Sequence, residues 1–161
     1  HSIVHVGTHC DAPAHVIEGA KTMDEIPLDT FIGEAVIVDA DVSTELEIKA
    51  DVLKNYEIKE GDIVLIRTGY SKYWNKPEYV EKSPYFSPEL AQALVDLKIK
   101  AIGVDFLSPD PVVSDSPAHK ILLGSDIPII ENLNIKASSN FLKSSPVNFC
   151  ILSSLYTNVF L

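Results

Sequence analysis

Residues 87–106 read SPELAQALVDLKIKAIGVDF, in which a helix signal is followed directly by a strand signal. Ser87 and Pro88 are residue types that begin helices, and leucines then recur every three or four positions to form one apolar stripe. The segment AIGVDF (101–106) is a continuous apolar run, which is typical of a strand covered on both faces. A helix that leads into a buried strand indicates an α/β or α+β arrangement.

The same alternation of strand and helix signals extends along the rest of the chain. Apolar, β-rich runs predict strands at 35–40, 62–68, 127–132 and 147–155, and helix signals cover 116–124 and, more weakly, 50–55. Ser116 is predicted to cap the helix that starts with Pro117. Strands interleaved with helices in a chain of 161 residues predict one α/β domain over 1–161.

Residues 70–86, YSKYWNKPEYVEKSPYF, are aromatic, charged and interrupted by proline. This composition predicts a surface loop or flap rather than a linker between domains. Its aromatic side chains either line a pocket or pack in a subunit contact, and the sequence does not rank these two: Tyr70, Tyr73, Trp74 and Tyr79.

The composition argues against a nucleic-acid-binding protein and against a membrane-spanning one. The formal net charge of −10 argues against nucleic acid as a partner, because an acidic surface repels phosphates. No apolar run approaches the roughly 20 residues that cross a bilayer. Cys10 and Cys150 lie far apart in apolar contexts, which suits a cytoplasmic protein without disulfides. Because the chain starts at His1 without Met, we expect that N-terminal sequence is missing.

Residues 5–15, HVGTHCDAPAH, hold three of the five histidines. In an extended chain the polar side chains share one side, because all are odd-numbered: His5, His9, Asp11 and His15. A straight strand would place His5 and His9 about 13 Å apart, so ligation of one ion requires a bend, which Gly7 permits. His5, His9 and Asp11 form a plausible three-ligand set that leaves positions open for water. The alternative is a pair of solvated histidines with Asp11 capping a turn.

The even-numbered Cys10 would face away from these histidines. We therefore expect a buried, unreactive thiol, and a soft metal ligand is the alternative.

Two distant residues add to this picture. His119 lies on the predicted helix 116–124, and Glu131 ends the apolar strand DIPIIEN. A carboxylate directly after buried isoleucines is costly unless it is paired or bound to metal. Taken singly, each also fits an ordinary surface role: a helix-surface histidine and a strand-end carboxylate facing water.

The pattern H-x-G-T-H-x-D-x-P-x-H, with every fixed position present in residues 5–15, resembles the signature of the cyclase, or kynurenine formamidase-like, family of metal-dependent hydrolases. The resemblance continues in the family's order through four blocks: IPLDTFIGEAVIVDA (26–40), GDIVLIRTGY (61–70), AIGVDFLSPD (101–110) and HKILLGSDIPIIENL (119–133). It implies a swivelling β/β/α-type fold with a mixed sheet or barrel-like core, and a homo-oligomer, either a dimer or a tetramer.

The resemblance also assigns roles to residues. It implies a centre of zinc or manganese, with two ions per subunit. His5, His9 and Asp11 match the ligands of the first ion, while Asp11, His119 and Glu131 match those of the second, with Asp11 bridging. His15 matches the family's catalytic histidine. The small-molecule substrates that the resemblance implies are amides, such as N-formylkynurenine or the cyclic amide isatin.

We therefore expect a metal-dependent hydrolase in which metal-bound hydroxide attacks an amide carbonyl and His15 acts as the acid and base. A role for His15 as an extra metal ligand is the alternative. A metal-dependent cyclase or dehydratase that uses the same residues is one alternative. A non-catalytic metal- or ligand-binding protein is another, and the presence of His15 beside the ligands argues against it.

Three further polar residues follow predicted strands. Asp105 and Asp110 either orient ligand histidines or are plain turn carboxylates. Arg67 is expected to form a structural salt bridge, with a carboxylate of the site or of a substrate as the alternative partner.

Overall fold

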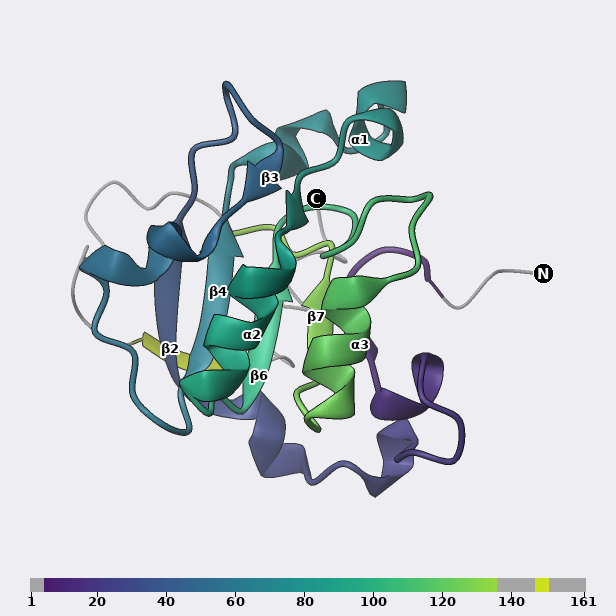
Figure 1. Ribbon diagram of the computed structural model, residues 1–161, viewed down its shortest axis with the longest axis vertical. Helices are drawn as coiled ribbons and strands as arrows, with labels where there is room; N and C mark the ends of the chain where they lie inside the picture. The colour runs from purple at the N-terminus through teal and green to yellow at the C-terminus, as the bar shows by residue number, and fades with distance from the viewer. Residues whose placement is uncertain (1–4, 136–146, 151–161) are drawn as a thin grey trace.

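The computed structural model describes residues 5–135 and 147–150 (Figure 1). A six-stranded sheet is ordered β1-β7-β6-β4-β2-β8. Its strands are β1 (His9–Asp11), β2 (Ile32–Asp39), β4 (Ile63–Arg67), β6 (Ala101–Val104), β7 (Ile129–Glu131) and β8 (Val147–Cys150). The four inner strands run parallel, and both edge strands, β1 and β8, run antiparallel to their neighbours. The sheet is therefore mixed, as predicted.

Three α-helices and several 3₁₀ helices complete the described part of the chain. They are α1 (Pro77–Glu81), α2 (Pro88–Asp96) and α3 (Pro117–Gly124), with 3₁₀ helices at Pro13–His15, Met23–Glu25, Leu28–Phe31, Ala50–Asn55 and Tyr70–Tyr73. A small parallel sheet joins β3 (Glu47–Ile48) to β5 (Tyr85–Phe86). Figure 1 shows α2 and α3 side by side on one face of the large sheet. The predicted α/β class, with a mixed sheet and few helices, is confirmed.

Strand side chains alternate between two apolar clusters, one on each face of the sheet. On the helix-covered face, Val64 and Ile102 pack in the cluster that contains Leu90 of α2. On the other face, Leu65 packs with residues such as Leu133. Each fully buried side chain of this size contributes roughly 1.5–3 kcal/mol. Gly103 permits the second contact, since a Cβ there would lie 2.6 Å from Leu133 Cδ1 and Leu65 Cδ2.

The two predicted helix caps have different outcomes. Ser87 caps α2 as predicted, because its hydroxyl accepts a hydrogen bond from Leu90 N at 3.2 Å. The prediction for Ser116 is wrong: its backbone is left-handed (φ 53°) and its side chain makes no capping bond. The first N–H groups of α3 are instead satisfied by Asp110, whose carboxylate accepts from Ala118 N and His119 N at 2.9 Å each.

The prediction of a loop or flap over 70–86 is also wrong. The segment contains a 3₁₀ helix, α1 and β5, because its aromatic rings bury apolar surface. Tyr70 and Tyr79 are buried and their rings stack with centroids 5.9 Å apart. The Tyr70 hydroxyl donates toward the carbonyls of Glu78 and Lys82, which close the segment on itself. Only Trp74 among its aromatic side chains is largely exposed, at 46%.

The last predicted strand lies partly outside the described residues. The prediction covered 147–155, and β8 accounts for Val147–Cys150. No helix within the described residues is long and apolar enough to span a membrane.

Candidate metal centre

The pairing of β1 with β7 brings the first ligands together. His9 lies opposite Glu131 in the antiparallel register, and Asp11 follows on the same side of β1. Gly7 has φ 65°, so the chain turns there, as predicted, and His5 folds back beside His9. The distance between His5 Nδ1 and His9 Nε2 is 2.8 Å.

These four side chains form one potential ligand group. Their ligating atoms all lie within 4.8 Å of one another: His5, His9, Asp11 and Glu131. Asp11 Oδ1 lies 3.5 Å from His5 Nδ1 and 3.6 Å from His9 Nε2, and Glu131 Oε2 lies 3.3 Å from His9 Nε2. His9 Nδ1 lies 2.9 Å from the Gly7 carbonyl, which fixes the ring with Nε2 toward the carboxylates.

A second group shares Asp11 and contains His15 and His119. His119 Nε2 lies 3.5 Å from Asp11 Oδ2 and 3.4 Å from Glu131 Oε1. His15 reaches the group from the 3₁₀ helix Pro13–His15, so the predicted strand parity holds for His9 and Asp11 but not for His15. Its ring centroid lies 4.6 Å from that of His5 and 5.7 Å from that of His119. All six predicted site residues are therefore neighbours.

The carboxylates of Asp11 and Glu131 show whether a cation would fit this site. Both residues are only 4% exposed. Asp11 Oδ2 and Glu131 Oε1 are buried without a hydrogen-bond partner. An unpartnered buried carboxylate oxygen is costly, and a divalent cation among imidazole nitrogens would remove that cost. The nitrogen and oxygen donors are of the kinds that zinc and manganese accept.

Asp110 orients His119. Its Oδ2 lies 2.6 Å from His119 Nδ1, so the opposite nitrogen, Nε2, faces Asp11 and Glu131. This arrangement fulfils the orienting role considered for Asp110. Burial by itself lowers the pKa of His119, but the nearby carboxylates of Asp11, Asp110 and Glu131 outweigh burial and raise the pKa to about 11. In the metal-free chain a proton therefore occupies the place where a cation would neutralise the same carboxylates.

The pKa values of the other two groups follow from the same charges. Burial raises the pKa of Asp11, but the His119 ring 3.5 Å away and the other nearby histidines outweigh burial and lower it. Partial burial lowers the pKa of His15; the charge of Asp11 opposes this, while the charges of His5 and His119 act with burial, and the net direction is downward. A lowered pKa favours the neutral imidazole, which can accept a proton.

Asp105 and Arg67 do not reach the site. Asp105 accepts hydrogen bonds from Thr68 N, Thr68 Oγ1 and Gly69 N at 2.6–2.9 Å, so it is a turn carboxylate that joins the ends of β4 and β6. Arg67 pairs with Asp39 through two hydrogen bonds of 2.6 and 2.9 Å, which is the structural salt bridge that was expected.

Cys10 is half-buried rather than buried as expected: it packs against the cluster that contains Leu65 and Leu133, and it also lines the hollow beside the first ligand group. Burial raises its pKa to about 12, and the negative charge of Asp11 adds to the effect. A thiol with this pKa stays protonated, in agreement with the expected unreactive role. The side chain of Cys150 lies outside the description.

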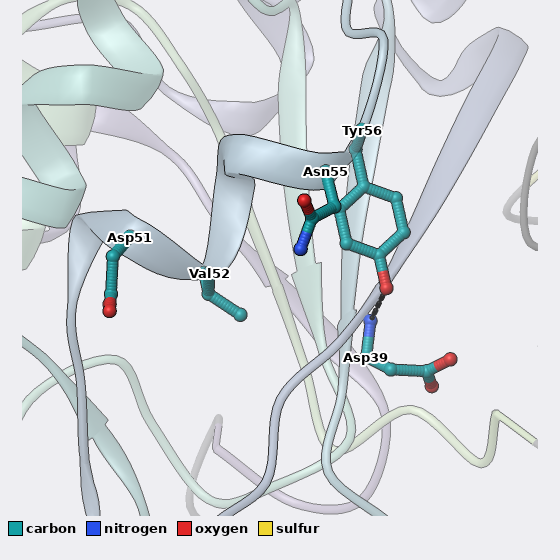
Figure 2. A pocket seen from close by; sticks show the side chains of 5 residues that line it. All are labelled: Asp39, Asp51, Val52, Asn55 and Tyr56. Atoms are coloured by element: carbon teal, nitrogen blue, oxygen red, sulfur yellow. Dashed lines mark hydrogen bonds between the residues drawn. The ribbon is translucent and has the colours of Figure 1, made fainter.

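Two hollows in the surface differ in their relation to this centre. One, of about 330 Å³, opens onto the ligands and is lined by His5, His9, Cys10, Asp11, Ala12, Ala14, His15, Thr22 and Met23. The other, of about 380 Å³, is lined by Asp39, Asp51, Val52, Asn55 and Tyr56 (Figure 2). In the second, the Tyr56 hydroxyl accepts a hydrogen bond from Asp39 N and the Asp39 carboxylate already pairs with Arg67. The first hollow is therefore the candidate substrate site.

The family model described as "Putative cyclase" matches residues 1–111. The chain belongs to the Cyclase family. The match includes β1 with the first histidines, and it covers more than half of the Cyclase chain.

Similar proteins include a kynurenine formamidase of Salinibacter ruber, 32% identical over 80% of this Cyclase chain and 60% of the relative. A solved potential metal-dependent hydrolase with cyclase activity has a TM-score of 0.74 and 32% identity, over 84% of this chain and 66% of that one. Isatin hydrolase A of Labrenzia aggregata, bound to benzyl benzoate, has a TM-score of 0.70 and 27% identity, over 81% and 60%. The chain thus spans about 60% of the length of the curated relatives it matches.

Sequence reasoning missed two residues near the centre: Asn132, which bonds to Thr8 beside His9, and Met23, which lines the hollow. Asn132 has a left-handed backbone directly after Glu131, and an asparagine after a strand is a weak signal of such a position. Met23 lines the candidate substrate hollow from the 3₁₀ helix Met23–Glu25. The sequence offers no signal for this placement, because it depends on how that helix packs beside the ligands.

Proposed function

We propose that this Cyclase-family chain is the metal-binding part of a hydrolase that cleaves the C–N bond of a small amide. The substrate class is an arylformamide such as N-formylkynurenine or a cyclic amide such as isatin. This proposal rests on two buried carboxylate oxygens that face His119 and lack hydrogen-bond partners, one from Asp11 and one from Glu131. The names of the relatives, a kynurenine formamidase and an isatin hydrolase, support the same reaction class.

The centre would hold two ions of zinc or manganese. His5, His9 and Asp11 would hold the first, and Asp11, His119 and Glu131 the second; the other oxygen of Glu131 lies 3.3 Å from His9 and could also serve the first group. A divalent ion supplies an acidified water and a Lewis acid for the carbonyl when it is bound. Asp110 would keep the lone pair of His119 Nε2 directed at the ion by holding the proton on Nδ1.

His15 would act as the acid and base. It is exposed at the mouth of the hollow, where a substrate has access, and its lowered pKa leaves it able to accept a proton at neutral pH. The imidazole would take a proton from water and return it to the leaving nitrogen. Ala14 and Met23 give the hollow an apolar side, and its volume of about 330 Å³ suits a substrate with one or two rings.

Metal analysis joined to a substrate panel tests this function. We expect the purified chain to retain or take up Zn²⁺ or Mn²⁺ and to hydrolyse at least one of N-formylkynurenine, isatin, small lactams and esters. A chain that takes up no divalent metal would refute the metal centre. Metal uptake with dehydration products and no hydrolysis would instead support a cyclase or dehydratase.

We further propose that the protein works in the cytoplasm as a dimer or tetramer on a small-molecule substrate. The free thiol of Cys10 supports a reducing compartment, and the net charge of −10 argues against nucleic acid as a partner. Light scattering of the purified protein measures the oligomer size, and a monomer at micromolar concentration would contradict that part.

A further inference from the structure

Asn132 joins three segments that are distant in the sequence. Its carbonyl accepts a hydrogen bond from the Thr8 hydroxyl at 2.7 Å, and its Oδ1 accepts one from the Tyr79 hydroxyl at 2.7 Å. Its N–H donates to the Phe106 carbonyl at 3.2 Å. With φ 58°, Asn132 occupies a backbone conformation that favours glycine and asparagine. Side-chain and backbone groups of Asn132, which directly follows β7, therefore connect the residue before β1, the chain just after β6 and the segment 70–82.

The residues next to Thr8 and Asn132 in the sequence are proposed metal ligands. Thr8 immediately precedes His9, Asn132 immediately follows Glu131, and His9 and Glu131 are opposite each other in the β1–β7 register. The two bonds to Asn132 thus lie one residue away from a pair of ligands whose mutual position defines the first group.

Tyr79 donates the hydrogen bond that joins the segment 70–82 to Asn132. Its side chain is 4% exposed, and its ring packs between those of Tyr70 and Trp74, with centroids 5.9 and 5.2 Å away. Figure 1 shows α1, which carries Tyr79, beyond the carboxyl ends of the parallel strands. The ring is held by packing in the aromatic segment, so its hydroxyl is a fixed donor for Asn132.

We propose that Tyr79 is a positioning residue that acts through Asn132 to hold Glu131 and His9 in metal-binding geometry. This inference rests on the proposed metal centre and adds a residue outside the ligand set. The two effects are thermodynamically linked. If an ordered segment 70–82 raises the affinity of the first group for metal by some factor, bound metal raises the equilibrium constant for ordering of that segment by the same factor.

The test measures Zn²⁺ affinity by competition with a chromophoric chelator. Tyr79→Phe keeps the ring and removes only the donor, and we expect Zn²⁺ to bind about tenfold more weakly, at the lower limit of losses seen for groups that support metal ligands. Asn132→Gly removes the acceptor and suits the left-handed backbone, so it should weaken binding similarly. Adding Tyr79→Phe to Asn132→Gly should cause no further loss.

Tyr73→Phe is the matched control. Tyr73 lies in the same segment, its ring packs on Tyr70 at 4.8 Å, and within the described residues its hydroxyl makes no hydrogen bond. It should bind Zn²⁺ like the original chain. Hydrogen exchange of segment 70–82 with and without Zn²⁺ gives a second measurement, in which Zn²⁺ should slow exchange in the original chain and less so in Tyr79→Phe.

The outcomes separate this inference from the proposed function. Normal Zn²⁺ affinity in a folded Tyr79→Phe, or additive losses in the double variant, would overturn the inference and leave the metal centre intact. Failure of the original chain itself to bind Zn²⁺ or Mn²⁺ would overturn both.

Discussion

The carboxylate of Asp110 contacts His119 twice, at the ring Nδ1 at 2.6 Å and at the backbone N–H at 2.9 Å. One side chain thus caps helix α3 and sets the direction of the imidazole that the helix carries. The Asp110 carboxylate therefore determines both where α3 begins and which nitrogen of His119 faces the other site residues.

Asp110→Asn is expected to weaken Zn²⁺ binding by about 10- to 100-fold, because an amide no longer favours the proton on Nδ1. It should also lower the free energy of unfolding by about 1–3 kcal/mol, because a charged acceptor of buried N–H groups is lost. Chelator competition and urea titration measure these effects. Asp115→Asn, on the exposed part of the same loop, should change neither quantity.

The metal-free chain should lose stability as the pH rises. The pKa of His119 is raised from an unfolded value near 6.5 to about 11, so its contribution is complete below about pH 6.5 and disappears as the pH approaches 11. In EDTA we expect the free energy of unfolding to fall by up to about 1.4 kcal/mol per pH unit between pH 7 and 10. Urea titrations of His119→Gln should show a smaller slope, and equal slopes would contradict the assignment.

His15→Ala should retain metal and lose at least about 100-fold in turnover on whichever panel amide is hydrolysed. Because burial and the charges of His5 and His119 lower the pKa of His15, kcat/KM should rise with pH through a value below 6.5 and then level. Bound metal content is the control measurement. Undiminished turnover in the variant would remove His15 from the reaction.

Arg67→Gln should leave Zn²⁺ affinity and turnover unchanged. Its partner Asp39 is about half exposed, so the loss of their pair should cost about 1 kcal/mol or less. A double-mutant cycle with Asp39→Asn measures the coupling. A rise in KM for Arg67→Gln would revive the alternative in which this guanidinium pairs with a substrate carboxylate.

The sequence was sufficient where local chemistry decides the structure. The cap at Ser87 and the strand predicted over 101–106 depend on neighbouring residues; the cap is found as predicted, and the strand is found over 101–104. The grouping of His5 with His9 required only a bend at Gly7. Glu131 could be suspected because a carboxylate that follows buried isoleucines needs a partner.

The sequence was insufficient where a distant group replaces a local one. Ser116 looks like a cap, but Asp110, from the preceding loop, takes its place. The aromatic segment looks like a loop because its helices are short and broken by proline, and the burial of Tyr70 and Tyr79 decides otherwise. Glu131 also faces His9 rather than His119 alone, which only the β1–β7 register reveals.

The bond between Thr8 and Asn132 joins residues 124 positions apart, and β1 pairs beside it. Closing a loop of this length is among the slowest and entropically most costly contacts a chain can make. A cation bound beside this contact would therefore favour chains in which β1 is already paired with β7. Metal content would then report the fraction of chains in which β1 is paired. In a chain without the ion, the β1–β7 pairing should be the first part of the sheet to open.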